Sequence, residues 1–146
     1  MTLEPASLAL HLRAVGLIMA GLVAVNVCVP GRLGWKEDLA RVSPLNRQIF
    51  VAHTVFLILL LALLAALFLA CADALLEPGR LSRAVLSGLI AFWGLRMLMQ
   101  WFFYSPAHWR GDRFRTLAHG VFSLAWIYVT GVCASALWVN LHAAAR

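Results

Sequence analysis

The chain has 146 residues, of which 63% are apolar and 12% charged, and its formal net charge is +6. Soluble domains carry about 25% charged residues, so this composition excludes a soluble globular domain, whose surface needs more polar side chains. It predicts a protein whose solvent is the lipid bilayer.

Four apolar runs are long enough to cross a hydrocarbon core, which takes about 20 helical residues. In chain order the predicted helices cover residues 8–29, 45–73, 81–105 and 113–142. Pro30 and Gly31 are expected to end the first helix, while Ser43, Pro44 and Asp112 have the features of helix starts. Backbone groups in hydrocarbon must pair within their own segment, and these runs are too long for barrel strands. We therefore expect an all-α membrane protein, a four-helix transmembrane bundle with short loops that forms a single domain, 1–146.

The first loop, residues 31–47, contains a short amphipathic pattern. Trp35 and Leu39 are four residues apart, and charged residues stand between them. This spacing predicts a short interfacial helix that lies on the membrane surface.

The basic residues lie near the predicted helix ends, interleaved with Trp and Tyr, which is typical of a membrane interface and not of a nucleic-acid surface. No nucleic-acid partner is therefore expected. The two loops on one side carry Arg32, Lys36, Arg41, Arg47, Arg110, Arg113 and Arg115, and the other side carries Arg13, Arg80, Arg83 and Arg146. By the positive-inside rule, we expect an integral protein of a bacterial inner membrane with these two loops in the cytoplasm and both termini outside.

Each predicted helix carries one polar residue at a similar depth beneath the charged loops. At a rise of 1.5 Å per residue, these side chains lie about 6 to 9 Å inside their helix ends. They are Asn26, His53, Gln100 and His119. Arg96 lies one turn deeper than Gln100 on the same face, since residues four apart are neighbours on a helix. Because polar side chains are costly in hydrocarbon, we predict that these five residues form a ligand site.

Two ligands suit these side chains. In the first hypothesis His53 and His119 are the axial metal ligands of a b-type haem, with Arg96 on a propionate and Gln100 near a ring nitrogen. In the second, the histidines, Gln100 and Arg96 bind the polar head of a quinone-like lipid by hydrogen bonds. Either ligand would serve electron transfer.

Two alternatives stay open. The polar residues can act as hydrogen bonds between helices without a ligand. The chain can also be a non-catalytic accessory subunit of a larger respiratory or photosynthetic complex, with neighbouring membrane subunits as its partners. Di-iron and zinc-hydrolase chemistry is not expected, because the helices lack the carboxylate and histidine patterns that such sites need. No motif identifies a family, and whether the protein is an enzyme is left open.

Overall fold

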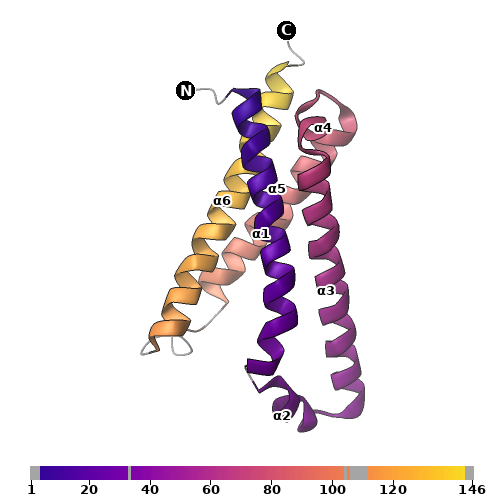
Figure 1. Cartoon of the computed structure of the whole chain (residues 1–146), viewed down its shortest axis with the longest axis vertical. Helices are drawn as coiled ribbons and strands as arrows, with labels where there is room; N and C mark the ends of the chain where they lie inside the picture. Colours follow the sequence, from indigo (N-terminus) through magenta and orange to yellow (C-terminus); the bar gives the residue numbers. More distant parts are fainter. Residues whose placement is uncertain (1–3, 33, 104, 106–111, 144–146) are drawn as a thin grey trace. The chain divides into compact units, whose positions relative to one another are not determined.

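The computed structural model describes residues 4–32, 34–103, 105 and 112–143, and within them the chain forms helices and turns without a strand. The helices are α1 (Pro5–Arg32), α2 (Trp35–Ala40), α3 (Pro44–Ala70), α4 (Ala72–Leu76), α5 (Arg80–Phe102) and α6 (Arg113–Ala143), as labelled in Figure 1. Four of them, α1, α3, α5 and α6, are long and apolar enough to cross a membrane. The predicted fold class, an all-α membrane protein with four transmembrane helices, is confirmed.

The predicted helix starts are formed by the expected side chains. Ser43 Oγ accepts a hydrogen bond from the backbone N–H of Asn46 at 3.4 Å, with Pro44 at the first helical position of α3. Asp112 Oδ1 accepts the N–H groups of Phe114 at 2.9 Å and Arg115 at 3.1 Å. These bonds satisfy backbone donors that a helix leaves unpaired in its first turn.

Other helix limits differ from the prediction. Helix α1 continues to Arg32, three residues beyond its expected end, because the φ angle of about −65° that a proline ring imposes is compatible with a helix. The predicted second helix is divided at Cys71, whose backbone leaves the helical region with φ −117° and ψ 21°. Helix α5 ends at Phe102 rather than at residue 105. The basic residues Arg110 and Arg146, used above for the orientation, lie outside the described residues, as does the side chain of Arg32.

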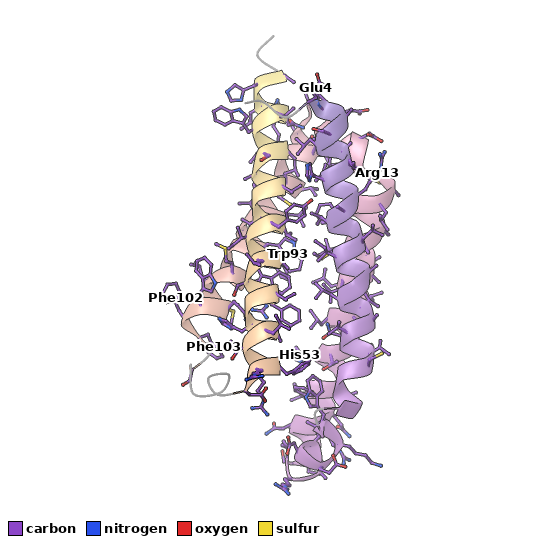
Figure 2. All side chains as sticks on the ribbon, turned by 60° about the vertical axis from the view of Figure 1, so that its left-hand side comes forward. Glu4, Arg13, His53, Trp93, Phe102 and Phe103 are labelled. Atoms are coloured by element: carbon purple, nitrogen blue, oxygen red, sulfur yellow. The ribbon has the colours of Figure 1, made fainter. Side chains whose placement is uncertain are left out.

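The chain divides into two compact units, one of Met1–Leu12 with Ala72–Arg146 and one of Arg13–Cys71. In the first unit α5 and α6 pack along each other, and α4 contacts both (Figure 1). The buried side chains of this unit include Leu8, Leu12, Leu86, Trp93, Trp126, Val129, Cys133 and Ala136. Phe102 and Phe103 project from the end of α5 with 80% and 71% of their surface exposed, as expected for aromatic residues at a membrane interface (Figure 2). The single domain stays a prediction.

The second unit contains most of α1, from Arg13 onward, together with α2 and α3. The predicted helix in the first loop is confirmed as α2, and its Trp35 packs edge-on against Phe50 of α3 with ring centroids 5.1 Å apart. Along α3 only Leu61, Ala65 and Phe68 are buried, at the spacing of one helix face. The other leucines and valines of α3 are mostly exposed, which suits a helix that faces hydrocarbon.

A close approach of two helices in this unit gives a testable consequence at Gly16. A Cβ atom there would lie 2.7 Å from Leu69 Cγ and 3.1 Å from Phe68 Cβ. Gly16→Ile is therefore expected to lower the free energy of unfolding by about 1 to 3 kcal/mol, because Leu69 would have to shift and Phe68, which is fully buried, has little room to do so. Reversible unfolding in detergent micelles measures the loss. The matched control is Gly21→Ile in the same helix, where a Cβ would meet nothing within 4 Å; equal stability of the two variants would contradict the prediction.

Candidate functional site

Gln100 is the centre of a polar cluster between α5 and α6. Its side chain is buried, with 6% of its surface exposed. Its Oε1 accepts a hydrogen bond from Arg96 Nη1 at 3.1 Å, and its Nε2 lies 2.9 Å from His119 Nδ1. The structure thus brings together three of the five predicted site residues, and the pairing of Arg96 with Gln100 follows from their spacing of four on one helix.

The same contacts define the tautomer of His119. A guanidinium group has only donors, so Gln100 must turn its carbonyl oxygen toward Arg96 and its NH₂ group toward the histidine. His119 Nδ1 then accepts, and the proton of the neutral ring lies on Nε2. Nε2 of the neutral imidazole is then a donor and not an acceptor.

Aromatic rings form the other side of the cluster. The guanidinium carbon of Arg96 lies 5.0 Å from the centroid of the Trp126 ring, a cation–π contact. Trp126 stacks on Trp93 with centroids 5.0 Å apart and an interplanar angle of 13°, and on Phe122 at 6.0 Å. The planar stack keeps the arginine charge on an aromatic face within the membrane span.

Several buried polar atoms beside this stack have no hydrogen-bond partner within the described structure. They are Trp93 Nε1, Trp126 Nε1, Ser123 Oγ and Thr130 Oγ1. Ser123, Trp126 and Thr130 follow His119 at intervals of four, seven and eleven residues, so they continue the same face of α6. Buried polar groups are normally paired, and an unpaired one indicates a bound water or ligand. Since an indole N–H can only donate, the two tryptophans would need an acceptor.

Asn26 and His53, the two other predicted site residues, belong to the second unit. Asn26 Nδ2 donates to the Leu22 carbonyl at 2.8 Å, and His53 Nδ1 lies 2.8 Å from the Ile49 carbonyl. Because a carbonyl only accepts, the proton of His53 lies on Nδ1 and the lone pair on Nε2, which is the usual form of a metal-ligating histidine. Within the described part of the chain, no group of three or more His, Cys, Asp or Glu side chains is placed to hold a metal ion.

Sequence reasoning missed a second polar cluster, at the far end of α6. Asn140 is fully buried, and its Nδ2 donates to the Glu77 carbonyl at 2.6 Å and to Ser82 Oγ at 2.9 Å. Its Oδ1 accepts from Arg83 Nε at 2.9 Å. The signal was present in the sequence, since Asn140 is an amide within an otherwise apolar run, but its depth did not match the predicted polar level.

The fold and these contacts define a small all-α membrane protein with a buried, donor-rich polar cluster between two of its transmembrane helices. Comparisons of the chain with protein-family models, with curated proteins and with solved structures found no match.

Proposed function

We propose that the α5/α6 cluster binds the head group of a membrane lipid that carries ring carbonyl oxygens, a molecule of the quinone class. The observation that carries this proposal is the excess of donors: the guanidinium of Arg96 and the buried indole N–H groups of Trp93 and Trp126 can only donate. A carbonyl oxygen only accepts. A planar ring also matches the flat aromatic stack that Trp126 forms with its neighbours.

Access from the bilayer supports a lipid ligand. Arg96 and His119 are half-buried, and exposed apolar side chains lie near them on both helices, among them Leu98 and Trp101 of α5 and Leu117 and Val121 of α6. A ligand dissolved in hydrocarbon would reach these donors sideways from the membrane, without crossing the loops. We propose electron transfer through the bound ring as the purpose of the site.

The donor set suits a carbonyl ligand better than haem iron. An axial histidine gives iron the lone pair of one nitrogen and donates the N–H of the other. At His119 the Nδ1 lone pair accepts from Gln100, and Nε2 carries the proton. His53 has the metal-ligand form, but a haem held by both histidines would first require the Gln100 amide to turn away from Arg96.

The proposal is tested with a decyl-benzoquinone added to the purified protein in lipid nanodiscs. Quinones quench tryptophan fluorescence on contact, so saturable quenching is expected from Trp93 and Trp126. Arg96→Leu should weaken binding about 10- to 100-fold, because a hydrogen bond from a charged donor is worth about 1.5 to 3 kcal/mol. Arg113→Leu is the matched control, since it removes the same charge from an exposed position at the start of α6 and should leave binding unchanged.

Three results would contradict the proposal. Equal affinity of the Arg96→Leu and Arg113→Leu variants would place the quinone elsewhere. A Soret band in the purified protein that is lost in His53→Ala and in His119→Ala would favour haem. The accessory-subunit hypothesis would be favoured if the protein is stable only in a complex with other membrane chains and binds no quinone.

A further inference from the structure

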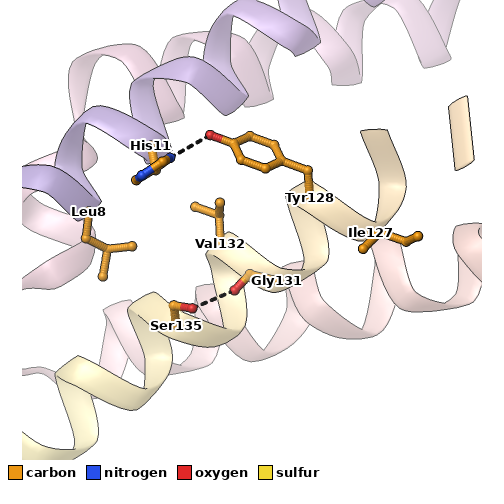
Figure 3. Close-up of a pocket in the computed structure, with 7 residues that line it drawn as sticks. All are labelled: Leu8, His11, Ile127, Tyr128, Gly131, Val132 and Ser135. Carbon is orange, nitrogen blue, oxygen red and sulfur yellow. Dashed lines mark hydrogen bonds between the residues drawn. The ribbon is translucent and has the colours of Figure 1, made fainter. Parts of the chain in front are cut away.

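A second polar pair lies in the first unit, between the beginning of α1 and the middle of α6. His11 Nδ1 and the hydroxyl oxygen of Tyr128 are 2.8 Å apart, and the two rings meet edge-on with centroids 6.0 Å apart (Figure 3). Neither residue takes part in the α5/α6 cluster. Polar pairs of this kind are costly in hydrocarbon and indicate a function or a packing role.

This pair lines a cavity of about 220 Å³. The other lining residues are mostly apolar: Leu8, Ile127, Gly131, Val132 and Ser135. Figure 3 shows His11 and Tyr128 pointing toward each other at one side of this space. The hydroxyl of Ser135 donates to the Gly131 carbonyl at 2.9 Å, so it is satisfied within its own helix. The polar character of the cavity therefore comes from the histidine and the tyrosine.

The cavity is open to its surroundings at Gly131. A Cβ atom built on this glycine would meet nothing within 4 Å, and the residue is exposed in the middle of a transmembrane helix. The cavity is therefore reached from the hydrocarbon of the bilayer. A molecule that fills it must dissolve in the membrane and carry no charge.

The size of the cavity and its His11–Tyr128 pair restrict the chemical class of the ligand further. An apolar cavity of about 150 Å³ holds a benzene molecule, so this one has room for a single substituted ring. A phenolic hydroxyl and a neutral imidazole can each donate and accept. They can pair with a ligand hydroxyl, which also donates and accepts, whereas the α5/α6 cluster contains an excess of donors.

We propose that this cavity is a second binding site, which takes a membrane-dissolved molecule with one ring and a hydroxyl group, of the phenol class. Its apolar ring lies against Leu8 and Val132, and its hydroxyl joins the hydrogen bond between His11 and Tyr128. This proposal does not depend on the ligand of the α5/α6 cluster.

The test uses 4-fluorophenol and the full chain in lipid nanodiscs, with fluorine NMR to separate saturable binding from partition into lipid. The wild-type protein should bind the probe saturably. It should bind 4-fluorotoluene, which has the same shape without the hydroxyl, about three- to tenfold more weakly, the effect of one lost hydrogen bond. Tyr128→Phe should reduce the affinity for 4-fluorophenol by a similar factor.

Gly131→Leu puts a large side chain into the cavity at a position where a Cβ atom meets nothing within 4 Å, and it should abolish saturable binding. Gly88→Leu in α5 is the matched control, because a Cβ there also meets nothing within 4 Å, and it should bind like the wild type. Melting temperatures of both variants in the nanodiscs confirm that they are folded. The proposal is overturned if the wild type binds no probe saturably, if both probes bind equally, or if Gly131→Leu still binds. A different result would assign the cavity to a second copy of the chain: the wild type forms dimers and binds no probe, and Gly131→Leu dissociates these dimers.

Discussion

Replacement of Asn140 by leucine is expected to lower the free energy of unfolding by about 3 kcal/mol, a large share of the stability of a small protein. The buried amide bonds a carbonyl just after α4, that of Glu77, and two side chains in the first turn of α5, at Ser82 Oγ and Arg83 Nε. Hydrogen bonds between membrane helices contribute about 0.6 to 2 kcal/mol each. Leucine would remove these three bonds and the longer one to the Leu75 carbonyl, and Arg83 would keep only the backbone carbonyl of residue 140, at 3.4 Å, as an acceptor there.

The effect of Asn140→Leu is measured by SDS-driven unfolding in mixed micelles, followed by tryptophan fluorescence. Ser135→Ala is the control on the same helix, because that hydroxyl bonds only a carbonyl one turn earlier and should contribute about 0.5 kcal/mol or less. Ser82→Ala should fall between the two variants. If Asn140→Leu proves as stable as Ser135→Ala, the amide network contributes nothing to the fold.

Exchange of Gln100 for glutamate is expected to move the proton of His119 from Nε2 to Nδ1. A carboxylate only accepts, so it would take one hydrogen bond from Arg96 and would need a donor from the imidazole. The arginine charge compensates the buried carboxylate, which keeps the variant folded. The neutral ring of His119 would then have its lone pair on Nε2, which is the form that ligates metals. Quinone binding should fall by tenfold or more, because Nε2 would no longer be a hydrogen-bond donor.

Nitrogen NMR of protein labelled at the histidine rings reads the tautomer directly. The wild-type His119 should show an unprotonated Nδ1, and Gln100→Glu should show a protonated one. The spectrum of His119→Gln identifies which signals belong to this residue. A wild-type ring already protonated at Nδ1 would contradict the amide orientation on which the proposed donor cluster depends.

The fold could be predicted largely from hydropathy. Unpaired backbone groups are so costly in hydrocarbon that four long apolar runs are expected to form transmembrane helices. The starts of α3 and α6 were also predictable, since Ser43 and Asp112 are local caps whose partners lie within three residues. The break at Cys71 was not, because neither glycine nor proline marks it and the apolar run continues through it. Ala72 and Leu75, which follow the break, are buried, and hydropathy does not encode such packing.

The contacts of the candidate site could be predicted where both residues belong to one helix. Arg96 and Gln100 meet because they are four residues apart, whereas their contact with His119 depends on the register between α5 and α6. Depth counting selected His119, which does contact Gln100, but gave Tyr128 no role, since depth says nothing about which face of a helix a side chain occupies. The aromatic stack on Arg96 was missed for the same reason: Trp93 and Trp126 are 33 positions apart and are brought together only by helix packing.

The stacked indoles of Trp93 and Trp126 are also an intrinsic optical probe of helix packing. Two stacked chromophores with ring centroids 5.0 Å apart couple their strong far-ultraviolet transitions, and a twist between the two transition dipoles then gives a couplet in the circular dichroism spectrum. Each indole comes from a different helix, so this couplet exists only while α5 and α6 are docked in the observed register. Arg96 lies over one of the two rings, so binding of the proposed ligand beside it should change the same signal without any label.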